Sequence, residues 1–139
     1  MAQENVEIVR AVYGRWSKGD FRPSGDLFDP NFALVLGPDF PDAGTYRGTE
    51  EVAAYMRGFL EPWTHLTIEP ERIAAAGRGV LANVLQRGVG STSGVPTEFR
   101  YFQLWTCSDR RVIRLEGIRD QAEALAAAGL PPLDDPRGG

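Results

Sequence analysis

Apolar and polar positions recur most regularly between Thr97 and Leu130, and this pattern predicts a β-hairpin that runs into a short helix. The segment 99–106 is rich in aromatic residues, which favour a pleated, half-buried surface. The segment 112–118 alternates apolar and charged residues over most of its length, as a half-buried strand does. Ser108-Asp109-Arg110 lies between the two segments and is typical of a turn.

Matching the apolar faces of the two strands predicts how they pair, because a shift of one residue would turn every side chain to the other face. The first face is expected to hold Phe102, Leu104, Ile113 and Leu115. The second face is expected to hold Tyr101, Gln103, Trp105, Arg114 and Glu116. Tyrosine and tryptophan beside arginine are typical of a subunit contact, so this second face predicts a homodimer.

The helix after the hairpin has clear signals at both ends. Asp120 is a good N-cap residue, and Glu123, three residues later, completes a capping-box pattern. The following run of alanines favours a helix. Gly129 is expected to end it in a left-handed conformation, and Pro131 prevents its continuation. We therefore expect one domain over residues 1–130 and a polar C-terminal tail over 131–139.

The N-terminal half alternates between helical and extended patterns. Residues 4–18 carry an apolar stripe at helical spacing, and Phe32–Leu36 is expected to be a short buried strand after a turn at 29–31. The loop Gly37–Gly44 is followed by a second amphipathic helix, with Thr49 as its expected N-cap. Pro62 is expected to stop that helix.

From His65 onward the pattern is extended. The segment 65–73 predicts a strand in which Pro70 indicates a sheet edge or a bulge, since proline cannot donate a ladder hydrogen bond. A Gly-Arg-Gly turn at 77–79 leads to a strand over 80–87, and the glycine-rich segment 88–96 is expected to be a loop.

Composition narrows the classes of function. The chain has 139 residues and a net charge of -4, and its basic residues form no stripe, so we expect no nucleic-acid partner. No apolar run approaches the ~20 residues that span a bilayer, and the first residues lack a signal-peptide pattern. We therefore expect a cytoplasmic protein without a membrane partner. A single Cys, Cys107, and a single His, His65, predict no metal site and no cofactor.

Three groups of residues together resemble SnoaL-like proteins of the NTF2-like superfamily. They are the first helix ending in Gly19-Asp20, the segment Tyr46–Val52, and the hairpin Gln103–Thr106 with the helix Asp120–Leu130 that follows it. The resemblance implies an α+β cone, in which a curved antiparallel sheet wraps around the N-terminal helices and encloses an apolar pocket. It also implies carboxylate chemistry on a small apolar or polyketide-like molecule, since members include polyketide cyclases and ketosteroid isomerases.

Three residues are candidates for acid/base catalysis, and we rank them Asp39, His65, Asp120. The resemblance places Asp39 at the spacing of the isomerase base, and neighbouring Phe40 and Trp63 would partly desolvate its carboxylate. The resemblance places His65 at the open end of the cone, where it is either a proton shuttle or an exposed strand end. The resemblance matches Asp120 to the acid/base aspartate of the cyclases, but we favour its role as a helix cap with Glu123 over a catalytic one.

Aromatic residues at helical and strand spacing are expected to line the pocket. They are Trp16, Phe40, Tyr55, Phe59, Trp63 and Phe102. The oxyanion-hole tyrosine and acid of the ketosteroid isomerases align with Val12 and Phe102, so the resemblance argues against that particular reaction. The leading hypothesis is a cyclase or isomerase-type enzyme. The alternatives are a non-catalytic ligand-binding or accessory domain, and an enzyme like limonene epoxide hydrolase that uses Glu98 and Arg100.

Overall fold

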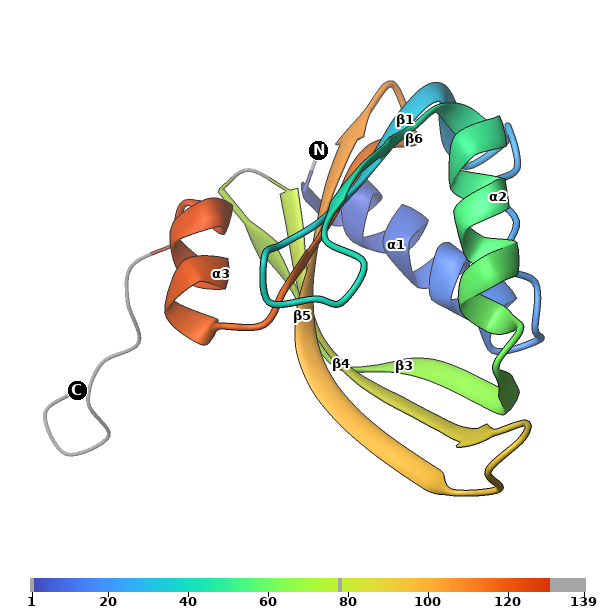
Figure 1. The fold of residues 1–139 in the computed structure, drawn as a ribbon. Coiled ribbons are helices and arrows are strands. Elements are labelled where there is room, and N and C mark those ends of the chain that lie inside the picture. The colour runs from blue at the N-terminus through green and yellow to red at the C-terminus, as the bar shows by residue number, and fades with distance from the viewer. Residues whose placement is uncertain (1, 78, 131–139) are drawn as a thin grey trace, which may run out of the picture.

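The computed structural model describes residues 2–77 and 79–130 and confirms the α+β class expected from the sequence (Figure 1). The helices are α1 (Ala2–Trp16), α2 (Gly48–Leu60) and α3 (Gln121–Ala128). The strands are β1 (Phe28–Leu36), β2 (Gly44–Arg47), β3 (Trp63–Ala76), β4 (Gly79–Gly90), β5 (Pro96–Ser108) and β6 (Arg111–Ile118). They form one sheet in the order β2-β1-β6-β5-β4-β3, antiparallel except for the β1–β6 pair.

The curved sheet has a helix layer on each side (Figure 1). Helices α1 and α2 lie on the concave side, and α3 lies on the other side. The apolar stripe of α1 meets the sheet in the main core, where Val9 and Val12 pack with Val80 and Trp105, all of them buried. A smaller cluster holds α3 against β4 and β5 through Leu81 and other small or apolar residues. The sheet therefore buries parts of both its faces.

The predicted faces of the hairpin are wrong. Trp105 pairs directly with Leu115, and Gln103 with Gly117, so these residues share the concave face. The register shifts next to Thr106, where Ile113 is an extra, unpaired residue that reverses the alternation expected from the apolar pattern. Consequently Tyr101, Gln103 and Trp105 are buried inside the cone and cannot form the subunit contact that we expected. Leu104 instead packs beneath α3.

Helix caps agree with the sequence at α3 and differ at α2. Asp120 accepts a hydrogen bond from the Glu123 backbone N–H at 2.9 Å, and Gly129 adopts the left-handed conformation with φ 75°. Helix α2 begins at Gly48, so Thr49 lies inside the helix and the prediction that it is the cap is wrong. Glu51 accepts a hydrogen bond at 3.0 Å from the N–H of Arg47, the N-cap residue, whose own side chain makes no capping hydrogen bond.

Strands extend into three segments predicted as turn or loop. In the segment 88–96, β4 continues to Gly90 and β5 begins at Pro96. Strand β1 begins at Phe28, and the expected turn at 29–31 is an irregularity within it, where Asp29 accepts a hydrogen bond from the Asn31 N–H at 2.8 Å. The short strand β2 was not predicted. Both indications from Pro70 are confirmed, since β3 is an edge strand and its register shifts after this residue. Residue 78 of the next turn and the tail 131–139 lie outside the described residues.

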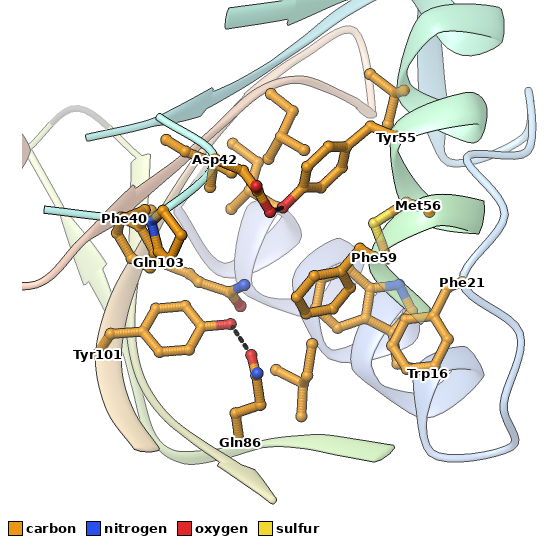
Figure 2. Close-up of a pocket in the computed structure, with 18 of the residues that line it drawn as sticks. Trp16, Phe21, Phe40, Asp42, Tyr55, Met56, Phe59, Gln86, Tyr101 and Gln103 are labelled. Atoms are coloured by element: carbon orange, nitrogen blue, oxygen red, sulfur yellow. Dashed lines mark hydrogen bonds between the residues drawn. The ribbon is translucent and has the colours of Figure 1, made fainter. Parts of the chain in front are cut away.

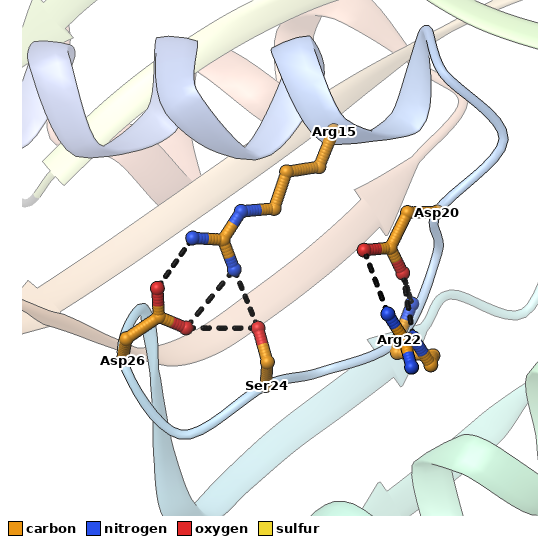
Figure 3. A network of polar contacts seen from close by, with 5 residues as sticks. All are labelled: Arg15, Asp20, Arg22, Ser24 and Asp26. Atoms are coloured by element: carbon orange, nitrogen blue, oxygen red, sulfur yellow. Dashed lines mark hydrogen bonds and ion pairs between the residues drawn. The ribbon is translucent and has the colours of Figure 1, made fainter.

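Polar contacts hold the segment between α1 and β1 (Figure 3). The Arg15 guanidinium pairs with the Asp26 carboxylate and also donates to Ser24. Asp20 pairs with Arg22, with 2.9 Å between its Oδ1 and the Arg22 Nε. These contacts position the connection that carries Phe21 to the edge of the interior cavity.

Candidate functional site

The concave side of the sheet encloses a cavity of ≈ 780 Å³. This volume lies within the range of about 300–1,000 Å³ that is usual for small-molecule sites. Helices α1 and α2, strand β1, the loop 37–43 and strands β3 to β6 all contribute to the wall. The lining is mainly aromatic and aliphatic, with a few polar groups contributed by Asp39, Asp42, Gln86, Thr97, Gln103 and Arg119.

Gln103 is the most strongly constrained of these polar groups. The indole N–H of Trp105 donates to the Tyr13 hydroxyl oxygen at 2.9 Å, and the Tyr13 hydroxyl donates its single hydrogen to Gln103 at 2.6 Å. The Gln103 atom that receives this hydrogen must be the carbonyl Oε1, because an amide nitrogen cannot accept it. This chain of hydrogen bonds therefore fixes the orientation of the Gln103 amide.

The fixed orientation leaves the Gln103 Nε2 hydrogens without an acceptor among the described residues. Gln103 lines the cavity, and no buried side-chain nitrogen or oxygen of the described chain lacks a partner, so this amide group reaches the open space (Figure 2). Burial raises the pKa of Tyr13 well above its ordinary value, so its hydroxyl stays protonated and remains a donor. The Gln103 amide thus presents preoriented N–H groups to the cavity, where they can donate to an oxygen of a ligand.

A second polar pair lies next along the wall. The Tyr101 hydroxyl donates to Gln86 Oε1 at 2.9 Å, as Figure 2 shows. Burial raises the pKa of Tyr101, so this hydroxyl is also neutral near pH 7. Gln86, Tyr101 and Gln103 lie on the concave faces of the adjacent strands β4 and β5, and together they form a polar strip on an otherwise apolar wall.

Two carboxylates, Asp39 and Asp42, stand at the mouth of the cavity on the loop between β1 and β2. The Tyr55 hydroxyl of α2 points to Asp42 Oδ2 at 3.4 Å, and the Tyr46 hydroxyl donates to the Asp42 backbone oxygen at 2.9 Å. Burial, and secondly the charge of Asp42, raises the pKa of Tyr55, so Tyr55 keeps its proton. Both carboxylates are exposed, and both can meet a ligand that enters here.

The predicted site residues divide into two groups. The structure places Asp39, Trp16, Phe40, Tyr55, Phe59 and Trp63 on the cavity wall. Phe102 lies on the opposite face of β5, against the cluster beneath α3, so the prediction that it lines the pocket is wrong. The reason is the hairpin register described above.

His65 and Asp120 are not on the cavity wall. His65 is exposed at a register shift of the edge strand β3, and its backbone has a φ of 57°. The Asp120 side chain is exposed and caps α3. The structure therefore supports the alternative hypotheses, in which His65 is an exposed strand end and Asp120 is a helix cap.

The sequence reasoning missed Gln103, Gln86 and Tyr13. Tyr13 and Gln103 each lie one residue beyond Val12 and Phe102, the positions aligned with the isomerase oxyanion hole. The available signal was a glutamine between Tyr101 and Trp105 on one strand face, since such a face can be a polar strip in a buried wall. The arrangement considered for epoxide hydrolysis lies outside the cavity, where Arg100 pairs with Glu71 at 3.0 Å.

The described residues give no sign of a metal centre or a membrane span. Within residues 2–77 and 79–130, no three His, Cys, Asp or Glu side chains are grouped so that they could hold a metal ion. No helix in the same part of the chain has the length and apolar character needed to cross a bilayer.

Comparison with known proteins identifies the class. The fold is the α+β cone of the NTF2-like and ketosteroid isomerase-like proteins. The SnoaL-like domain family matches residues 9–115, and the chain belongs to this family. No curated protein matches the chain.

Solved structures share the fold at low sequence identity. A SnoaL-like polyketide cyclase, so described provisionally, from Jannaschia sp. CCS1 superposes with a TM-score of 0.73 and 19% identity, covering 94% of this chain and 95% of that one. TerC, co-crystallised with polyporic acid, superposes with a TM-score of 0.72 and 18% identity, covering 90% of this chain and 97% of that one. A third structure is a hypothetical protein from Catenulispora acidiphila with a ketosteroid isomerase-like fold, in complex with trimethylamine. It superposes with a TM-score of 0.68 and 19% identity, covering 90% of this chain and 94% of that one.

Proposed function

We propose that this protein binds a small apolar or polyketide-like molecule that carries a carbonyl oxygen, and that it catalyses cyclisation or isomerisation by carboxylate acid/base chemistry. The observation that carries the proposal is the Gln103 amide, which is fixed by Tyr13 and Trp105 and is free to donate into a ≈ 780 Å³ apolar cavity. A preoriented donor in a water-poor site stabilises negative charge that develops on a carbonyl oxygen.

The proposed reaction begins with removal of a proton. Asp39 takes a proton from the carbon next to the carbonyl, the C–H electrons form an enolate, and the Gln103 N–H groups bind the enolate oxygen. In a cyclase the enolate carbon then attacks a second carbonyl of the same molecule, and the protonated carboxyl returns its proton to the new alkoxide. In an isomerase the proton returns to a different carbon. Neither route consumes a further reagent.

Asp39 is our first choice for the base, and Asp42 is the alternative within the same loop. Asp39 lines the cavity and takes part in no ion pair recorded among the described residues. Asp42 also lines the cavity, but it already faces the Tyr55 hydroxyl. His65 and Asp120 would have to act from outside the wall, so we no longer rank them as proton carriers in the proposed mechanism.

A second candidate function is ligand binding without catalysis. The polar groups set deep in the cavity are glutamine amides and protonated tyrosines, which exchange no proton near pH 7, whereas both carboxylates are exposed at the mouth. That arrangement favours recognition of a ligand. The two functions differ in whether a bound ligand places an acidic C–H within reach of Asp39 or Asp42.

The experiment is deuterium exchange into 2-tetralone, an apolar ketone with acidic C–H groups, followed by NMR in D₂O. We expect the wild type to exchange deuterium into the ketone faster than buffer does. In Asp39→Asn the rate of enzyme-catalysed exchange should fall about 100-fold or more, while the ketone still binds. Asp109→Asn, in the exposed β5–β6 turn, is the matched control and should exchange like wild type. Binding without exchange would support the second function. Full exchange by Asp39→Asn together with none by a folded Asp120→Asn would contradict our choice of base.

The homodimer and the cytoplasmic location remain proposals. The face on which the dimer was predicted is buried within one chain, so a dimer would have to use another surface. Sedimentation velocity at micromolar concentration tests the homodimer, and a monomer at that concentration would contradict it.

A further inference from the structure

Two hollows border each other across the loop 37–43. The main cavity has a volume of ≈ 780 Å³, and a second hollow of ≈ 220 Å³ lies beside it. Four residues line both of them: Asp39, Phe40, Gly117 and Arg119. The second hollow reaches the side of the sheet that carries α3, since Glu123 and Ala127 also line it. The shared residues therefore separate the main cavity from the side of the sheet that carries α3.

Phe40 is the one aromatic side chain among the four residues shared by the two hollows. It packs edge to face on Tyr101, with 5.4 Å between ring centroids, and on Phe99, with 6.2 Å. On its other side is Gly117, where a Cβ atom would come within 3.3 Å of the ring Cζ. The absence of a side chain at Gly117 makes room for the ring against the backbone of β6.

The loop that carries Phe40 is anchored on both sides of it. The Gly37 N–H donates to the Gly117 carbonyl at 3.1 Å, and the Tyr46 hydroxyl donates to the Asp42 carbonyl at 2.9 Å. The Phe40 side chain itself is held only by nonpolar and aromatic contacts. It can therefore turn aside without breaking the hydrogen bonds that anchor the loop.

We propose that Phe40 is a gate between the main cavity and the second hollow, and that it sets the length of ligand that this protein accepts. The proposal rests on the proposed function only in that the cavity binds apolar molecules. The corresponding ligand class is an apolar ring bearing a carbonyl group and a linear chain. The ring and the near part of the chain fill the main cavity, and a longer chain must pass Phe40 into the second hollow.

Binding of a homologous series of phenyl alkyl ketones, from acetophenone upward, tests the gate by calorimetry. Each added methylene should strengthen binding about fourfold while it is being buried. In the wild type this gain should stop at a definite chain length. In Phe40→Ala the two hollows join, so the gain should continue for at least two further methylenes. Phe40→Leu, a milder change, should shift the limit in the same direction if the alanine variant folds poorly.

Two matched variants separate a gate from a simple gain of volume. Phe59→Ala removes an aromatic ring that lines only the main cavity, so any gain in its length limit should be unaffected when Val35→Phe is added. Val35 lines only the second hollow, so Val35→Phe in the Phe40→Ala background should fill that space and restore the wild-type limit. An unchanged limit in Phe40→Ala, or no effect of Val35→Phe in the Phe40→Ala background, would overturn the gate while the binding function stands. Failure of every ketone to bind any variant would overturn both.

Discussion

The Tyr13 hydroxyl donates to Gln103 Oε1 over 2.6 Å and so joins α1 to β5 across 90 positions of sequence. Because Tyr13 also accepts from Trp105, three buried side chains form one directional chain that ends in an amide facing the cavity. Removing the hydroxyl would free the Gln103 amide to rotate and would leave two buried polar groups without a partner. The stability of the core and the affinity for a carbonyl ligand are therefore linked through this contact.

The first prediction is that Tyr13→Phe lowers both stability and affinity. The free energy of unfolding should fall by ~1–3 kcal/mol, because the Trp105 N–H and the Gln103 carbonyl lose their buried partner. Urea denaturation measures this loss. Tyr46→Phe is the control, since its hydroxyl bonds a backbone oxygen in the exposed loop and its removal should cost about 1 kcal/mol or less. Equal losses in the two variants would contradict the role given to the buried chain.

The second prediction concerns Asp120, which acts as a cap. Asp120→Ala should lower stability by ~0.5–2 kcal/mol, whereas Asp120→Asn should cost little because asparagine caps helices well. Thermal and urea unfolding measure both variants, and 2-tetralone exchange should be unchanged in Asp120→Asn. Loss of exchange in a stable Asp120→Asn protein would show that the carboxylate has a chemical role.

The third prediction is that the Cys107 thiol is unreactive in the folded protein. Burial raises the pKa of the Cys107 thiol to about 11, so little reactive thiolate exists near neutral pH. Alkylation by iodoacetamide at pH 8 should be slow in the folded protein and should become fast in urea. Cys107→Ala and treatment with a chelator should both leave ligand binding and exchange unchanged. Rapid alkylation of the native protein would contradict this account.

The fourth prediction concerns acid pH. Hydrogen bonds from Arg15 and then Ser24 lower the pKa of Asp26 below its ordinary value. A carboxylate with a lowered pKa stabilises the folded state at pH values above its unfolded pKa, near 4, and loses that contribution as the pH falls further. The stability difference between wild type and Asp26→Asn should therefore shrink between pH 5 and pH 2. A difference that is constant over this range would show that the Arg15–Asp26 pair does not contribute.

Much of the architecture follows from local patterns. The stripe in α1, the proline in β3 and the Asp120–Gly129 signals at α3 each depend on residues close in sequence, and the structure agrees with all of them. The boundaries differ by a few residues, mainly where strands extend into segments of turn-forming residues such as 29–31. Short strand β2 lacked any apolar alternation that could reveal it.

The polar strip on the cavity wall could not be predicted from the sequence because both faces of β5 are buried. When only one face of a strand is assumed to be buried, its polar residues are assigned to the solvent side. Gln103 is nevertheless only 5% exposed, and its carbonyl accepts a hydrogen bond from Tyr13 of α1. The extra residue near Ile113 then reversed the expected pairing and moved Phe102 away from the cavity. His65 and Asp120 follow elements that line the site, yet a local bend and a cap direct them elsewhere.

The most direct test of the central claim is the affinity of 2-tetralone compared with tetralin, the same ring system without the carbonyl, for wild type and Gln103→Leu. Isothermal titration calorimetry should show that the wild type prefers the ketone by roughly 3- to 10-fold, the contribution of one hydrogen bond in a protein site. Gln103→Leu should bind both compounds with equal affinity. If the wild type binds neither compound, or if Gln103→Leu keeps the full preference for the ketone, then the Gln103 amide is not the carbonyl-binding group of this cavity.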